Sequence, residues 1–117
     1  MELTLPFPPS LNSYYGHSSN SRVYVRKRGE LYRAAVQRSV REQAGRFQFR
    51  QPVSVFITFN NPAKVHEPWD MDNYKKAMFD ALTHAGLWFD DSLVHADCSY
   101  KGVQGGRGNV EIIVEVL

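Results

Sequence analysis

Four aspartates bracket one short segment of this chain and could together bind a metal ion. Asp70 and Asp72 precede the segment, two residues apart, and Asp90 and Asp91 follow it. Carboxylates held close together repel one another, and a bound dication relieves that repulsion. Because no cysteine cluster or paired-histidine motif accompanies the aspartates, their oxygen atoms favour Mg²⁺, or Mn²⁺ in its place, over zinc.

An ion of this kind suits the hydrolysis of a phosphodiester. Magnesium keeps several waters, accepts substrate phosphate oxygens as ligands, and can generate a hydroxide while it stabilises the leaving oxygen. Lys76 follows Asp72 by four residues, so both side chains would share one face of a helix. There the ammonium group could neutralise the scissile phosphate or orient the attacking water. A simpler interpretation stays open, in which the first acidic pair caps a helix and the second forms a solvated turn.

The segment between the two acidic pairs has the pattern of an amphipathic helix. Asp70 or Asp72 can serve as its N-cap, and Gly86 suits the left-handed residue that closes a helix. If the residues before the helix are extended, Met71 points away from its neighbours and the two carboxylates face the same way. The apolar positions recur at three- and four-residue spacing: Tyr74, Ala77, Met78, Ala81, Leu82 and Ala85.

The remaining pattern predicts an α+β domain. A basic helix is expected from Glu30 to about Gly45, and strands are expected over 2–5, 23–25, 53–59, 94–101 and 110–116. The last two strands, joined by a glycine-rich turn, have the pattern of an antiparallel hairpin. The order β-β-α-β-α-β-β favours a single mixed or antiparallel sheet with two helices packed on one face, a two-layer sandwich.

Length and composition indicate one globular domain over residues 1–117, with one hydrophobic core. The single cysteine, Cys98, permits no internal disulfide, so a reducing, cytoplasmic setting is expected. No stretch near Met1 has the pattern of a signal peptide, and no apolar run approaches the length that spans a membrane. We expect no membrane partner and no small-molecule cofactor.

Charge is divided unevenly along the chain, with +6 over residues 1–50 and −4 over residues 51–117. This division suits a protein that holds a polyanion with one part and a metal ion with the other. In the first helix, the apolar stripe consists of Tyr32, Val36, Val40, Ala44 and Phe47. Arg38 and Arg41 fall away from this stripe and Arg33 lies nearer its border. This basic face could follow a phosphate backbone, or it could be an ordinary solvated surface.

Residues 10 to 21 are expected to form an irregular polar loop without periodicity, and this loop could also contact nucleic acid. Its two tyrosines could stack on bases, although we expect one of them to pack on the core, while a histidine and an asparagine could meet phosphates or base edges. The full set of expected DNA contacts is Asn12, Tyr14, Tyr15, His17, Arg26, Lys27, Arg28, Arg33, Arg38, Arg41 and Asn73.

Taken together, these motifs resemble those of the RusA family of Holliday junction resolvases. The residues that carry the resemblance are 5–12 (Leu-Pro-Phe-Pro-Pro-Ser-Leu-Asn), Asp70-Met71-Asp72-Asn73 with Lys76, 79–82 (Phe-Asp-Ala-Leu), Gly86 and Asp90-Asp91. The resemblance implies a homodimer of small α+β subunits that nicks four-way DNA junctions symmetrically, in recombination and repair, with Mg²⁺ or Mn²⁺. It also implies that Asp70, Asp72 and Asp91 are metal-binding catalytic carboxylates and that Lys76 assists catalysis. Asp90 and Asn73 match the same motif, Asp90 as a further metal ligand.

One stretch departs from the family pattern. The resemblance implies a run of arginines just before the first catalytic aspartate, and this chain has His66-Glu67-Pro68-Trp69 there. The arginines of residues 22 to 50 are the candidates to supply the missing DNA affinity.

A homodimer would need an interface, and the chain offers more apolar side chains than one small core readily absorbs. We expect an exposed strand edge to form the interface, or part of the set Leu3, Leu5, Phe7, Tyr14, Tyr15, Leu87, Trp88 and Phe89.

Two other functions stay compatible with the sequence. One is a metal-dependent hydrolase of nucleotides, against which the absence of a glycine-rich phosphate loop counts. The other is a non-catalytic nucleic-acid-binding module whose aspartates are only helix caps.

Overall fold

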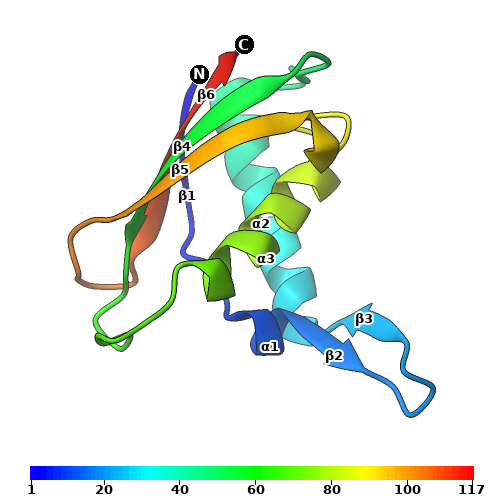
Figure 1. Ribbon diagram of the computed structural model, residues 1–117, viewed down its shortest axis with the longest axis vertical. Coiled ribbons are helices and arrows are strands. Elements are labelled where there is room, and N and C mark those ends of the chain that lie inside the picture. Colours follow the sequence, from blue (N-terminus) through cyan, green and yellow to red (C-terminus); the bar gives the residue numbers. More distant parts are fainter.

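The computed structural model describes residues 1–117 as two layers, a four-stranded sheet and two long helices on one of its faces (Figure 1). This is the α+β arrangement that the sequence predicts. The elements in chain order are β1 (Glu2–Leu5), α1 (Leu11–Tyr14), β2 (Tyr15–His17), β3 (Val23–Val25), α2 (Lys27–Ala44), β4 (Val53–Asn60), α3 (Asp72–His84), the 3₁₀ turn η1 (Asp91–Leu93), β5 (Val94–Lys101) and β6 (Asn109–Val116).

Strand β4 lies inside the sheet, whose order is β1-β6-β4-β5. It runs parallel to β5 and antiparallel to β6, so the predicted hairpin between the last two strands is wrong. The reason is burial. Every second residue of β4, from Val53 to Phe59, is at most 1% exposed. Such an apolar strand is most stable inside the sheet, with a hydrogen-bonded strand on each side. The more polar β5 takes the edge, and residues 102–108 cross over from it to β6.

The two helices bury their apolar faces against this sheet. In α3 the predicted stripe is correct, since Ala77, Met78, Ala81 and Leu82 are fully buried. Helix α2 begins at Lys27, three residues before the predicted start, and buries Tyr32, Val36 and Val40. Phe47 lies beyond the end of α2 and is 52% exposed, so it is not part of the stripe as predicted. No helix of the structure combines the length and the apolar character that crossing a membrane requires.

The segment predicted as an irregular polar loop contains regular structure. Residues 11–14 form the short helix α1, and β2 pairs with β3 in a two-stranded ribbon that projects from the body of the molecule (Figure 1). Tyr14 N–H and Ser13 N–H donate to the carbonyl of Ser10, which is why the chain turns there.

The face of the sheet opposite the helices is bare. Phe56, Tyr100 and Ile113 are 40–51% exposed on it, and the rings of Phe56 and Tyr100 stack with their centres 6.1 Å apart. Strand register places Phe56 beside Ile113 on β6, so these side chains form one apolar surface. We call Phe56, Tyr100 and Ile113 the open-face patch.

We predict that Gly29→Ala destabilises the fold. In the first turn of α2, a Cβ atom on Gly29 would stand 2.6 Å from Cγ1 of Val25 and 2.7 Å from the carbonyl oxygen of Tyr14. The resulting overpacking should cost about 1–3 kcal/mol, more than the 0.5–1 kcal/mol or so that alanine gains in a helix. Urea unfolding measures the difference. Gly105→Ala is the control, because a Cβ there meets nothing within 4 Å, and equal stability of the two variants would contradict the prediction.

Candidate active site

A groove of about 380 Å³ runs along the exposed side of α3 and brings together residues from three parts of the chain. Three of the predicted catalytic residues, Asp72, Lys76 and Asp91, line it. Asp70, Asp90 and Asn73 are not among its lining residues. The complete lining is Tyr15, Asp72, Lys75, Lys76, Phe79, Asp80 and Asp91.

The side chains of Asp70 and Asp72 differ in surroundings, because α3 begins at Asp72. Oδ1 of Asp70 accepts a hydrogen bond from the Asp72 N–H at 3.0 Å, which supplies a partner for one of the free N–H groups at a helix start. Met71 between them already has helical dihedral angles (φ −59°, ψ −35°). The extended geometry that would turn both carboxylates the same way is therefore not present. Oδ1 of Asp70 is occupied in the cap.

Lys75, for which no role was predicted, lies between two carboxylates. Its Nζ lies 2.9 Å from Oδ1 of Asp97 on β5 and 3.6 Å from Oδ1 of Asp72. The hydrogen bond to Asp97 raises the pKa of the Lys75 ammonium group. This lysine is therefore a fixed positive charge that ties α3 to the edge strand.

Lys76, in contrast, makes no ion pair and remains exposed in the groove. Its Nζ lies 5.6 Å from the centre of the Tyr15 ring, within the range of a cation–π contact. Burial, followed by the negative charge of Asp80, raises the pKa of the Tyr15 hydroxyl to about 12. Tyr15 therefore stays neutral at physiological pH, and Lys76 is the free cation of the groove.

Asp80 joins three helices in one charged cluster. Nη2 of Arg33 on α2 lies 2.7 Å from Oδ2 of Asp80, and the Tyr14 hydroxyl donates to the same oxygen. Nε of Arg33 donates to the Tyr14 oxygen at 2.8 Å. Burial, followed by the hydrogen bond to Asp80, raises the pKa of Tyr14. Asp80 was not among the predicted site residues, although the interval of four residues from Asp72 to Lys76 and from Lys76 to Asp80 could have placed it on the groove face.

This cluster corrects one predicted DNA contact and restricts a second. Tyr14 is fully buried, so its ring offers no face to a base, and it is the tyrosine that packs on the core as expected. The side chain of Arg33 is 25% exposed and its guanidinium is engaged by Asp80. Tyr15 is half-buried and reaches the groove.

The segment that carries the second acidic pair is anchored to the core. Phe49 and Trp88 form an isolated parallel bridge, in which Phe49 N–H donates to the carbonyl of Leu87 and Phe89 N–H to the carbonyl of Phe49. Oδ2 of Asp90 accepts from the Ser92 N–H at 3.3 Å. Hydrogen bonding by Ser92, first by its side chain and then by its backbone, lowers the pKa of the Asp90 carboxyl. Asp90 thus caps η1, and Asp91 is the member of the pair that faces the groove.

The side chains of the groove are of the type that binds a hard cation, but the protein alone does not bring enough of them together to complete a site. Asp72 and Asp91 offer carboxylate oxygens, and no thiol or imidazole lines the groove. No three acidic, histidine or cysteine side chains lie close enough together to hold a metal ion. Magnesium sites commonly use one or two carboxylates and complete the coordination with substrate phosphates and water, a requirement that two groove carboxylates can meet.

The other predicted DNA contacts are spread over the surface. Asn12, His17, Lys27, Arg28, Arg38 and Arg41 are exposed. Arg26 is also exposed, although its Nε donates to the carbonyl of Tyr15 at 3.0 Å. Asn73 is half-buried in the first turn of α3. The structure does not gather this set in one place, but Arg26, Lys27 and Arg28 together occupy the start of α2.

The chain is similar in sequence to known endodeoxyribonucleases. A sequence model of the family "Endodeoxyribonuclease RusA" matches residues 6–115, which include the whole groove lining. The crossover junction endodeoxyribonuclease RusA of Escherichia coli O139:H28 (strain E24377A / ETEC) is 41% identical over 92 residues, which are 79% of this chain and 74% of that protein. The proteins of the same name from Escherichia coli (strain K12) and Enterobacteria phage 82 are 40% and 39% identical over equal spans.

We predict that Asp80→Ala lowers stability, because it leaves the Arg33 guanidinium and the Tyr14 hydroxyl without their acceptor. The two charged side chains are 25% and 31% exposed, so the loss should be about 1–3 kcal/mol, below the 3–5 kcal/mol of a fully buried pair. The double variant Arg33→Met, Asp80→Leu should recover most of the lost stability, because it leaves no charged side chain without a partner. Thermal unfolding tests both; a double variant as unstable as the single one would contradict this account.

Proposed function

Since this chain belongs to the RusA family of endodeoxyribonucleases, we propose that it resolves four-way (Holliday) DNA junctions by hydrolysing phosphodiesters with a divalent cation. The observation that carries this proposal is the groove along α3, where Asp72, Lys76 and Asp91 share one lining. Carboxylates and a free lysine at one surface are the groups that this hydrolysis requires.

Mg²⁺, or Mn²⁺ in its place, is the proposed cofactor, held by Asp72 and Asp91 with Asp70 close by. A divalent cation bound there would lower the pKa of a water molecule and stabilise charge on the phosphate. The cap formed by Oδ1 of Asp70 leaves Oδ2 available. DNA itself would supply the remaining ligands through its phosphate oxygens, which accounts for a groove in which no three carboxylates converge.

The two neighbouring lysines take different roles. Lys75 donates to Asp97 and lies 3.6 Å from Asp72, so it keeps a positive charge beside the proposed metal-binding aspartate. Lys76 has no acidic partner and can donate to a non-bridging oxygen of the scissile phosphate, where negative charge grows as the water attacks. The ring of Tyr15 beneath it limits the directions in which the ammonium group can point.

The start of α2 is a proposed site of contact with the DNA backbone. Arg26, Lys27 and Arg28 stand at a helix N-terminus, where the helix dipole disfavours positive charge. A phosphate placed there would be stabilised by the side chains and by the free N–H groups of the first turn. Because the relatives come from bacteria and a bacteriophage, whose DNA lies in the bacterial cytoplasm, the cytoplasm is the proposed compartment.

A homodimer is the proposed active form, because a four-way junction has near two-fold symmetry and needs two opposed nicks. The interface expected from the sequence is largely unavailable, since Leu3, Leu5, Tyr14, Leu87 and Trp88 are buried in the core of the subunit itself. The open-face patch is apolar, exposed and lies opposite the helices. We propose that it packs on the same surface of a second copy, beside the free edge of β5.

Asp72→Asn should abolish most cleavage and leave the fold intact. The change removes a negative ligand while it keeps the shape of the side chain, so cleavage of a synthetic four-way junction in Mg²⁺ should fall about a hundredfold or more. Glu30→Gln is the matched control, since Glu30 is an exposed carboxylate of α2 outside the groove. Wild-type cleavage by the Asp72 variant would end the proposal, and linear duplex and free nucleotides in parallel reactions show whether the activity is selective for junctions.

Phe56→Glu should convert the dimer to a monomer, because it would bury two unpaired charges at a symmetric interface. Sedimentation equilibrium gives the mass at the protein concentration of the cleavage assay. Val103→Glu adds the same charge at a side chain that is 79% exposed in the loop after β5 and should leave the mass unchanged. A wild-type protein that cleaves both strands while it sediments as a monomer would contradict the dimer.

A further inference from the structure

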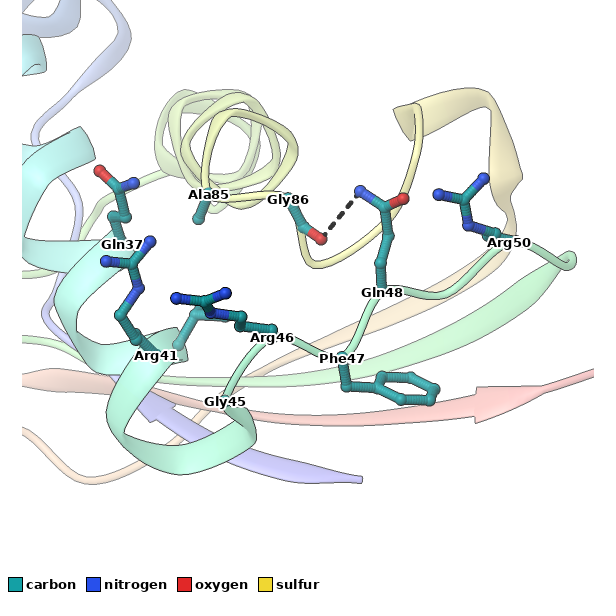
Figure 2. A pocket seen from close by; sticks show the side chains of 10 residues that line it. Gln37, Arg41, Gly45, Arg46, Phe47, Gln48, Arg50, Ala85 and Gly86 are labelled. Atoms are coloured by element: carbon teal, nitrogen blue, oxygen red, sulfur yellow. Dashed lines mark hydrogen bonds between the residues drawn. The ribbon is translucent and has the colours of Figure 1, made fainter.

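A second, basic pocket of about 310 Å³ lies at the opposite end of α3 from Asp72 (Figure 2). The end of α2, the segment after it and the loop that follows α3 form its walls. Arg41, Arg46 and Arg50 line this pocket, and no carboxylate does. The pocket is therefore a concentration of positive charge that the groove does not include.

None of these three guanidinium groups has an acidic partner, in contrast to Arg33. All three residues are exposed, and like charges around one hollow disfavour the folded state unless an anion neutralises them. Guanidinium groups bind phosphate oxygens with two parallel hydrogen bonds, which makes a phosphate the best-fitting anion.

The walls keep the arginines apart and the hollow open. Nε2 of Gln48 donates to the carbonyl of Gly86 at 3.2 Å, which joins the segment after α2 to the end of α3. Figure 2 shows Arg41 and Arg46 on one side of this hydrogen bond and Arg50 on the other. Gly45, in a left-handed conformation (φ 63°), has no neighbour within 4 Å of where a Cβ would stand. The three cations thus stand around a hollow that is open beside Gly45.

We propose that this pocket binds the phosphate backbone of one arm of the DNA junction, away from the site of cleavage; this inference rests on the proposed function. Helix α3 runs for thirteen residues from Asp72 to His84 before the chain reaches the pocket at Ala85. This length is about 20 Å, which corresponds to roughly six base pairs of duplex. Phe47, 52% exposed among the lining residues, offers an apolar surface to a sugar or base. A free inorganic phosphate would need neither that surface nor cations on two sides.

The test is a binding measurement without divalent metal, so that it does not depend on cleavage. The triple variant Arg41→Ala, Arg46→Ala, Arg50→Ala should bind a four-way junction roughly tenfold or more weakly than wild type, and the slope of log affinity against log salt should fall by about two to three. The charge-matched control is Lys64→Ala, Lys101→Ala, Arg107→Ala, three exposed cations that lie outside the pocket and outside the arginines of residues 22 to 50.

Neutral methylphosphonate linkages identify the contacted phosphates. They are placed in successive windows of three along one arm. In a window roughly six base pairs from the phosphate that the protein cleaves, they should weaken binding of the wild type and of the control, and have little further effect on the triple variant. An equal loss for both triple variants, or no window with this coupling, overturns the inference. Tight binding of inorganic triphosphate that the triple variant loses, with junction affinity retained, would assign the pocket to free polyphosphate and also overturn it. A wild type that neither binds nor cleaves junctions would instead refute the proposed function.

Discussion

Two neighbouring parallel strands cannot be joined by a tight turn, and this constraint organises the molecule. The chain leaves β4, the strand with the most buried side chains, and must cross a face of the sheet before it can run beside β4 again. Helix α3 makes that crossing. As a result, the start of the helix and the segment that follows it deliver Asp72 and Asp91 to one groove, while β5 returns Asp97 to within 2.9 Å of Lys75. The same path that builds the core positions the charged side chains.

The charged side chains around the groove fall into two groups: some are paired and stabilise the structure, and others have no ion-pair partner and remain free to react. Asp80 is committed to Arg33 and Tyr14 and joins three helices, and Lys75 is committed to Asp97. These pairs leave Lys76 without an acidic partner, and they leave Asp91 facing the groove from an anchored segment. Neighbouring residues of one helix, Lys75 and Lys76, thus differ in function because one reaches the edge strand and the other points over Tyr15.

Much of the fold and part of the site could be predicted from the sequence, and the division has a physical basis. Apolar spacing fixes which face of α3 is buried, because the period of a helix is a local property. The alternation in β5 and β6 is also local, but it indicates only which side chains share a face, so it could not reveal that β4 separates these strands. The bonds from Tyr14 to Asp80 and from Lys75 to Asp97 join residues 66 and 22 positions apart, distances at which no periodicity operates. The sequence allowed Asp70 either to cap the helix or to bind a metal ion, and the hydrogen bond that its Oδ1 accepts depends on the backbone angles at Met71.

The bridge between Phe49 and Trp88 has a consequence for how such a chain can change in evolution. Hydrogen bonds fasten the backbone at residues 87 and 89, and β5 begins at Val94, so the intervening residues have no spare length. An inserted or deleted residue there would shift Asp91 along the groove or break its anchor. The loop at residues 102–108 and the tip between β2 and β3 are surface turns, where changes in length are tolerated more readily. Lineages that descend from this chain should therefore vary in length at those turns and keep a constant spacing from Trp88 to Val94.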